Sequence, residues 1–435
     1  MLRKALRRVV ISVADQGWLS LMSFVVGLAF VRAASKETYA AYTLVYAAIM
    51  LFQSVQNALI VSPMMTIVPG KDEQQRSMCM WLVSRIQYML SALLFALWMI
   101  VGVLCMVFAS DRQNAGLELV FAGAIAMLGL LLREFGRAQS FLEGRPRTAL
   151  AQDLAFGALA LLGLFVLYIS EEVSAESVLL LTGVAGLVVG TATQLRRRRE
   201  YGQRADCDAG SASELNMVKE LWACAKWALP SVIASWGYAN AYVYIVAALS
   251  TTSAVADLFA SRLVLAPVPL LVAAWFNVFR PRASAWYHTG DLGLLLRAAR
   301  LSVAGLVAGG MLYGAAAYVC FPWVERYLFG AQYAALGPLV FGWTAYFVAG
   351  AVRNVGMGCV LSSSEGFRLM HHYTWIALLF ALPAIALASL ADSPLAILLA
   401  LAVAELIFAA LVWILGWPGV CRMRERMHVA AAYTG

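Results

Sequence analysis

Long apolar runs alternate with short polar segments along the whole chain. A helix needs ~20 mostly apolar residues to cross a membrane, and about twelve runs meet that need. None shows the strict alternation of apolar and polar positions that marks the strands of a membrane barrel. The pattern therefore predicts an all-α polytopic membrane protein with helices at about 12–32, 39–61, 84–108, 116–132, 150–169, 177–195, 227–249, 254–279, 301–321, 336–361, 373–391 and 394–417.

Basic residues between these runs predict the orientation of the chain. Cytoplasmic loops of membrane proteins carry an excess of Lys and Arg. The side opposite the N-terminus holds only Lys36, Arg112 and Arg326, with Arg32 at a helix edge. This asymmetry persists through all the predicted spans, so both termini are expected in the cytoplasm. The segments assigned to that side are 1–11, 62–83, 133–149, 196–226, 280–300, 362–372 and 418–435.

Composition agrees with a membrane location. Hydrophobic residues make up 62% of the 435-residue chain and charged residues only 13%, against ~45–50% and ~25% in soluble domains. The net charge of +8 fits basic cytoplasmic loops, and we expect no nucleic-acid partner. The first apolar run is interpreted as an uncleaved helix rather than a signal peptide, because Arg32 stands where a cleavage region should be small and uncharged.

The longest polar stretch, RRRREYGQRADCDAGSASELN, lies between the sixth and seventh predicted helices. We therefore predict an N-terminal six-helix bundle at 1–200, a cytoplasmic linker loop at 201–216 and a C-terminal six-helix bundle at 217–435. The segment 214–228 is amphipathic and is expected to lie along the inner membrane face. Because six is even, any repeat between the halves is parallel, about an axis along the membrane normal.

Several function classes lack their motifs in this sequence. The seven cysteines form no C-x-x-C pair, the four histidines have no metal-site spacing, and no G-x-x-x-x-G-K-[ST] phosphate loop is present. The predicted outer loops are short, whereas a membrane enzyme acting on outer-face sugars needs a sizeable external loop. We expect a protein that is not an enzyme and that binds no cofactor and no metal.

Three arginines inside or at the ends of predicted helices are candidate ligand contacts. Arg262 lies about nine residues, or ~13 Å, into the eighth helix, and Arg353 lies well inside the tenth. A central arginine costs at least ~2.5 kcal/mol and normally faces the bundle interior or a water-filled cavity. Guanidinium groups bind phosphate through paired, charge-assisted hydrogen bonds. Arg32, at the outer end of the first helix, is a third candidate, with snorkelling to the interface as the alternative.

Two carboxylates are candidates for coupling to H⁺ or Na⁺. Asp15 lies near the inner end of the first helix and Glu405 within the twelfth; for both, a structural pairing is the alternative. Asp257 opens the eighth helix but stands five residues from Arg262, a poor spacing for an ion pair on one helix. The two prolines that follow Arg262 free backbone carbonyls and predict a bend, which is tolerated where a helix lines a cavity.

Two stretches resemble the polysaccharide/oligosaccharide-lipid flippases of the multidrug/oligosaccharidyl-lipid/polysaccharide (MOP) exporter superfamily. In VVGLAFVRAASKETYAAYTLVYAAIMLFQSVQNALIVSPM, at 25–64, Arg32 precedes a small pair, polar residues and Tyr-x-x-Tyr, with Ser35 and Ala40 in place of two glycines. The stretch ERYLFGAQYAALGPLVFGWTAYFVAG, at 325–350, is similar to the connection before the family's tenth helix. The six-plus-six arrangement also fits this family.

The resemblance implies two six-helix bundles around a central cavity that opens to one side at a time. The implied function is transfer of a polyprenyl-pyrophosphate-linked oligosaccharide across the bacterial cytoplasmic membrane for O-antigen, capsule or exopolysaccharide synthesis. Arg262, Arg353 and Arg32 would then contact the substrate. The expected partners are this substrate, membrane lipids, a coupling ion and polysaccharide-assembly proteins. A cation-coupled multidrug exporter of the same superfamily, a peptidoglycan-precursor flippase and a membrane polysaccharide polymerase or ligase remain alternatives.

Overall fold

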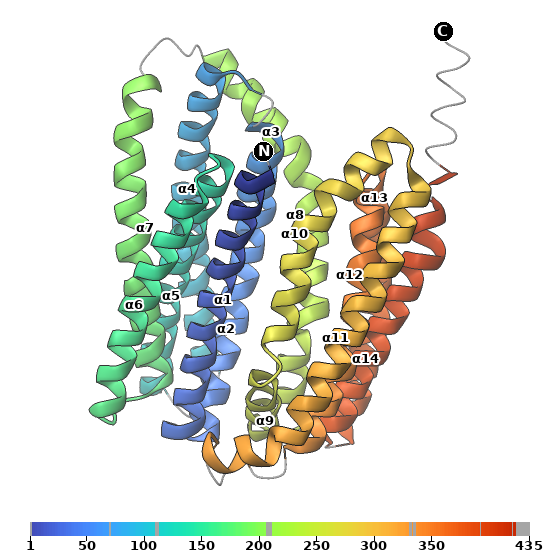
Figure 1. Ribbon diagram of the computed structural model, residues 1–435. Coiled ribbons are helices and arrows are strands. Elements are labelled where there is room, and N and C mark those ends of the chain that lie inside the picture. The colour runs from blue at the N-terminus through green and yellow to red at the C-terminus, as the bar shows by residue number, and fades with distance from the viewer. Residues whose placement is uncertain are drawn as a thin grey trace. The chain divides into compact units, whose positions relative to one another are not determined.

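The computed structural model describes residues 2–68, 71–108, 113–205, 211–329, 333, 336–391, 393–419 and 421–422. Within these ranges the regular secondary structure is entirely helical. The chain divides into two compact units, Met1–Trp236 and Gly237–Gly435, and the division falls inside one long helix (Figure 1).

The first unit is a bundle of long helices that run alongside one another (Figure 1). Local signals in the sequence place their ends: the Ser35 hydroxyl accepts a hydrogen bond from the backbone N–H of Thr38 and so caps the second helix. Pro146 occupies a first-turn position, where its missing N–H costs nothing. The elements are α1 (Leu2–Ala33), α2 (Lys36–Gln56), the π-helical η1 (Asn57–Val61), α3 (Ser62–Ile67), α4 (Glu73–Phe108), α5 (Gln113–Leu142), α6 (Pro146–Ile169), α7 (Ala175–Ala205) and the first part of α8 (Ser211–Leu249).

The second unit contains the rest of α8 and the remaining helices. Thr251, Ser363 and Ser393 each cap a helix by accepting a backbone N–H three residues further on. Gly290, with a φ of 94°, ends another helix in the left-handed conformation that glycine adopts most easily. The elements are α9 (Thr252–Leu263), α10 (Pro267–Thr289), α11 (Leu292–Tyr327), α12 (Gly337–Val360), α13 (Ser364–Leu390), α14 (Pro394–Ala410) and the π-helical η4 (Leu411–Gly416).

Each of the twelve predicted apolar segments coincides with one helix, a helix and its direct continuation, or the broken pair α9–α10. Among the described residues, nine helices are long and apolar enough to cross a membrane, or ten if the broken pair forms one span. Large apolar side chains such as Leu312 and Val319 are more than 70% exposed, which suits contact with lipid rather than water. The chain is therefore a multi-pass membrane protein.

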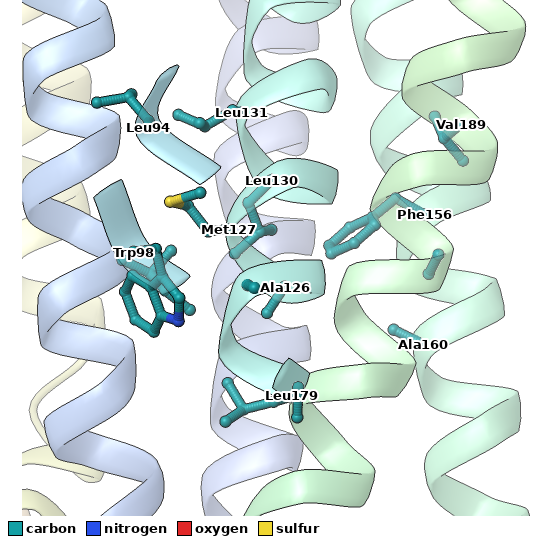
Figure 2. Packing of buried hydrophobic residues seen from close by; sticks show 14 residues of the cluster. Leu94, Trp98, Ala126, Met127, Leu130, Leu131, Phe156, Ala160, Leu179 and Val189 are labelled. Carbon is teal, nitrogen blue, oxygen red and sulfur yellow. The ribbon is translucent and has the colours of Figure 1, made fainter. Parts of the chain in front are cut away.

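The core of the first unit lies around α5. Met127 and Leu131 of α5 are fully buried between Trp98 of α4, Phe156 of α6 and Leu179 of α7 (Figure 2). The most extensive packing between any two described helices joins α5 to α7. Here the helices approach through glycines, because small residues let backbones come close when no water drives association. The close packing of α5 against α7 positions the charged side chains of α5.

The predicted amphipathic segment 214–228 forms the first half of α8 and continues without interruption into the apolar part of that helix. Met217 and Leu221 are buried in the core of the first unit, and Glu220 forms an ion pair with Lys71 at 2.7 Å. One face of the segment therefore packs on protein, in addition to any contact with the membrane face.

The predicted linker 201–216 contains less loop than the sequence suggests. Residues 201–205 close α7 and residues 211–216 open α8, whereas 206–210 lie outside the described residues. Charged and polar residues favour a loop by composition, but most of them are also compatible with a helix end. Just before this segment, Arg197 of α7 is buried and forms an ion pair with Glu143.

Candidate functional site

A break between α9 and α10 is the starting point of the site. Pro267 and Pro269 lack backbone N–H groups, so the helix cannot continue its hydrogen bonds through them. The two helices meet at an angle of 63°. The break is secured by a hydrogen bond of 3.0 Å from the Tyr313 hydroxyl, on α11, to the carbonyl of Val264. The bend predicted from the two prolines is confirmed.

Arg262, in the last turn of α9, lies at this break and is surrounded by aromatic rings. Its guanidinium carbon lies 5.2 Å from the ring centre of Trp343, 5.8 Å from Phe347 and 5.9 Å from Phe259. These distances are typical of cation–π contacts. Trp343 is fully buried, and its indole N–H donates to the carbonyl of Leu258 at 3.0 Å, which fixes the ring under the cation.

The charge of Arg262 has no carboxylate partner in the described part of the chain. No ion pair with Asp or Glu is formed there, and the side chain is only half-buried. Aromatic faces attract a cation but do not neutralise it. The break therefore presents a positive charge whose hydrogen-bond donors can receive an anion.

Arg353 of α12 differs from Arg262, because it is paired. Its Nε donates to Glu405 Oε2 at 2.6 Å and its Nη2 to Oε1 at 3.4 Å. Glu405, on α14, has only 2% of its side chain exposed, against 17% for Arg353. The guanidinium also lies over the ring of Phe408 at 5.1 Å. The two residues that sequence analysis assigned to different tasks, substrate contact and ion coupling, thus form one ion pair.

Tyr346 of α12 packs against Trp343, with the two ring centres 5.5 Å apart. It lies within electrostatic reach of Arg262, Arg353 and Glu405. Tyr346 and Arg353 are seven residues apart on α12, which places them on the same helix face two turns apart. Three of the five predicted site residues are therefore brought together in the second unit, from α9, α12 and α14.

Two tyrosines of α8 belong to the same site. Tyr238 and Tyr242 are four residues apart, so they share a helix face. The ring of Tyr238 lies 5.9 Å from the Arg353 guanidinium, and Tyr242 lies within electrostatic reach of Arg262. The buried hydroxyl of Tyr238 has no hydrogen-bond partner among the described residues. The i, i+4 spacing was visible in the sequence, but it is equally typical of packing residues.

A small cavity lies beside this group of residues. It has a volume of about 240 Å³ and is lined by Pro269, Val272, Ala273, Phe276 and Asn354. Asn354 follows Arg353 directly in the sequence and donates to the Gly350 carbonyl at 2.8 Å. Among the described side chains that line it, the cavity is thus mainly apolar, with the Asn354 amide at its wall.

A second charged cluster lies in the first unit. Arg137 of α5 binds Asp15 Oδ2 through Nη2 at 2.8 Å and Asp153 Oδ2 through Nε at 2.8 Å. Arg133 approaches Asp153 at 3.5 Å. Both aspartates are buried, with 1% and 0% exposure. Asp15 is therefore paired, and its partner is an arginine that sequence analysis had placed in the cytoplasmic segment 133–149.

Arg133 and Arg137 are part of α5 and are not in a loop. The helix continues to Leu142, and both arginines lie inside the bundle, 9% and 13% exposed. The rule that counts Lys and Arg near helix ends does not separate exposed from buried charges. The spacing of four residues was the available signal. Arg32 also belongs to the first unit, where it lies exposed on the last turn of α1.

Comparison with known proteins identifies the fold. No protein-family model and no curated protein sequence matches the chain. Solved structures match it over nearly its whole length. A MATE transporter in complex with MaL6 has a TM-score of 0.68 and 14% identity, covering 99% of this chain and 97% of its own. A MOP superfamily transporter from Pyrococcus furiosus, described as having a binding pocket of reversed polarity, has a TM-score of 0.69 and 12% identity, with coverages of 97% and 96%.

The lipid II flippase MurJ in an inward closed conformation is also similar, with a TM-score of 0.66, 12% identity and coverages of 93% and 87%. The fold is that of the MOP superfamily transporters. The match includes both units, so each of the two charged clusters lies within a part of the chain that has the MOP fold. At these identities the likeness concerns the fold, and the substrate has to be argued from the residues of the site.

Proposed function

We propose that this protein moves a polyprenyl-pyrophosphate-linked oligosaccharide across the bacterial cytoplasmic membrane by alternating access, as a step in surface polysaccharide assembly. The observation that carries the proposal is the environment of Arg262. This cation lies at a helix break, among aromatic rings, and has no carboxylate partner in the described part of the chain. A site with an excess of positive charge suits an anionic headgroup.

The physical requirement is compensation of the diphosphate as it leaves water. Moving an ionised group into an apolar medium without a partner costs far more than any single packing contact. An arginine supplies a charge that cannot be lost by deprotonation and two parallel donors that match phosphate oxygens. Arg262 supplies the first such contact, and the buried rings of Trp343 and Phe347 hold its guanidinium in place.

The remaining predicted residues have supporting roles in this proposal. Arg353 offers a second contact, and Arg32 of the first unit a third. Coupling to H⁺ or Na⁺ at Asp15 or Glu405 requires that an ion pair with arginine opens first, because both carboxylates are engaged. The lipid tail remains in the bilayer while the headgroup crosses.

A multidrug exporter is the second candidate, because solved structures of the same fold include a multidrug resistance MATE family transporter of the MOP superfamily. Export of cationic drugs needs a carboxylate that can face the drug. In the second unit the buried Glu405 is held by Arg353, and Arg262 adds a further positive charge. These charges favour an anionic substrate over a cationic one.

The test measures the lipid-linked glycan pool in a strain that lacks the gene and is complemented with variants. We expect accumulated polyprenyl-pyrophosphate oligosaccharide and lost surface polysaccharide with the empty vector and with Arg262→Gln. The matched control Arg300→Gln, an exposed residue of α11, should restore both. Protein in the membrane is quantified for each variant. Full activity of Arg262→Gln refutes its role, and an unchanged pool in the deletion strain refutes the function and directs attention to drug efflux.

A further inference from the structure

Three of the hydrogen-bond donors of Arg353 already have partners. A guanidinium has five N–H donors, and in Arg353 the Nε and Nη2 edge is taken by the two oxygens of Glu405. Nη1 donates to the sulfur of Met357 at 2.8 Å. An anion that arrives at Arg353 therefore finds the Nε–Nη2 edge occupied and the charge already opposed by Glu405, although the side chain is the more exposed member of the ion pair.

The position of Glu405 is built into the contact between α12 and α14. A Cβ atom on Gly350 would lie 3.6 Å from the carboxyl carbon of Glu405, so the carboxylate rests directly against the backbone of α12. Trp413 from the continuation of α14 donates to the Val352 carbonyl at 3.0 Å, close to the pair. The glutamate is thus held by its helix, whereas Arg353 has a long flexible stem.

If the Glu405 carboxylate is displaced from Arg353, it needs another hydrogen-bond donor, because a buried unpaired carboxylate is strongly disfavoured. The hydroxyl of Tyr238 is suited to this task. It is buried, has no hydrogen-bond partner among the described residues, and lies within electrostatic reach of both Glu405 and Arg353. A hydrogen bond from this hydroxyl can replace part of the hydrogen bonding that Glu405 loses when it leaves Arg353.

We propose that Glu405 is an internal competitor for Arg353, displaced by the anionic headgroup of the substrate and then received by Tyr238. The proposal rests on the proposed function and adds a source of selectivity to it. An anion bound at Arg262 gains the second arginine only if it binds Arg353 better than Glu405 does. A diphosphate can contact Arg262 with one phosphate and Arg353 with the other, whereas a carboxylate or a phosphate monoester has only one anionic group to share between them.

The experiment measures binding of inorganic pyrophosphate and of inorganic phosphate to the purified full-length protein by calorimetric titration. Glu405→Gln is nearly isosteric and removes the competing charge. We expect it to bind pyrophosphate at least about tenfold more tightly than the wild type, a change of about 1.4 kcal/mol. Phosphate should gain by a larger factor, so the preference for pyrophosphate falls. The matched control Glu118→Gln, an exposed residue of the first unit, should leave both affinities unchanged.

Two further variants identify the atoms involved. In the double variant Arg353→Gln/Glu405→Gln the gain should vanish, because the donors that Glu405 blocked are gone. Tyr238→Phe should weaken pyrophosphate binding in the wild type but not in the Glu405→Gln background. If Glu405→Gln does not fold, Glu405→Asp, whose shorter side chain reaches Arg353 less well, should show a smaller gain.

The outcomes separate this proposal from the function on which it rests. Pyrophosphate binding that requires Arg262 but does not respond to Glu405→Gln or Glu405→Asp overturns the competitor role and leaves the proposed function intact. Absence of pyrophosphate binding in the wild type and in Glu405→Gln alike overturns both. If the gain in pyrophosphate affinity persists in the double variant, Glu405 acts through the long-range repulsion of its negative charge and not by occupying Arg353. This result also overturns the proposal.

Discussion

Replacement of Gly183 by alanine should destabilise the first unit, because the new methyl group has no space. A Cβ atom at this position would lie 2.6 Å from the backbone nitrogen of Ala126 and from the carbonyl carbon of Ile125. Ordinary contacts begin at 3.4 Å. The obstacle is backbone, which cannot rotate away as a side chain can. The helices α5 and α7 therefore have to separate by the better part of an ångström.

The free-energy cost of that separation depends on how far the contact between α5 and α7 extends. Overpacking of a well-packed interior typically costs ~1–3 kcal/mol. Separation of the helices at Gly183 also loosens the next close contact between α5 and α7, where a Cβ on Gly186 would lie 2.6 Å from the carbonyl carbon of Gly129. Helices in lipid associate mainly through such van der Waals contacts. We expect a loss toward the upper end of this range.

The assay is the apparent melting temperature of the detergent-purified protein, followed by tryptophan fluorescence. The matched control is Gly305→Ala on α11, where a Cβ meets nothing within 4 Å. Both variants add one methyl group to a helix interior, a change that by itself favours the helix by ~0.5–1 kcal/mol. Gly183→Ala should melt several degrees below the wild type, at about 2–4 °C per kcal/mol, and Gly305→Ala should not. Melting of Gly183→Ala at or above the temperature of Gly305→Ala would refute the close packing of α5 against α7.

Two other predictions concern the charged clusters. Arg137→Gln leaves Asp15 and Asp153 buried with much of their charge uncompensated, and loss of a buried partner typically costs ~3–5 kcal/mol; size-exclusion profiles should show little folded protein. Arg145→Gln, at a side chain that is 57% exposed, is the control and should behave as the wild type. Trp343→Phe keeps a ring beneath Arg262 but removes the indole donor to α9, so the pyrophosphate titration should show weaker binding, though less weak than with Trp343→Ala.

The helices were predictable because their signal is local. A continuous apolar run such as 150–169 has no alternative in a membrane other than a helix, and α6 covers it. The broken span was equally local, because Pro267 and Pro269 act on their own helix. The depth of Arg262 along its segment also follows from residue counting alone. In each case the property belongs to one segment and needs no knowledge of its neighbours.

The pairing of charges was not predictable, since it depends on which helices are neighbours. Arg353 and Glu405 are 52 residues apart in sequence and Arg137 and Asp15 are 122 apart. Helical periodicity says which face a side chain occupies but not what lies opposite. From the sequence, Glu405 and Asp15 were therefore expected to be isolated carboxylates suited to ion coupling. In the structure, each forms an ion pair with an arginine. Whether they also carry an ion stays a prediction.

The net charge of the arginines and the glutamate in the second unit indicates the charge of the substrate. In the described part of the chain, Glu405 is the only carboxylate that pairs with Arg262 or Arg353, so this group of three retains one net positive charge. In the first unit Arg133 and Arg137 are matched by Asp15 and Asp153, with Glu134 in addition. Charges held by opposite partners inside a bundle stabilise one arrangement of helices. A cation without a carboxylate partner, such as Arg262, gains only its aromatic contacts until an anion arrives. Its remaining cost is best explained by a ligand that offsets it. This difference between the two clusters is why the second unit, and Arg262 in particular, is the place to test for a diphosphate.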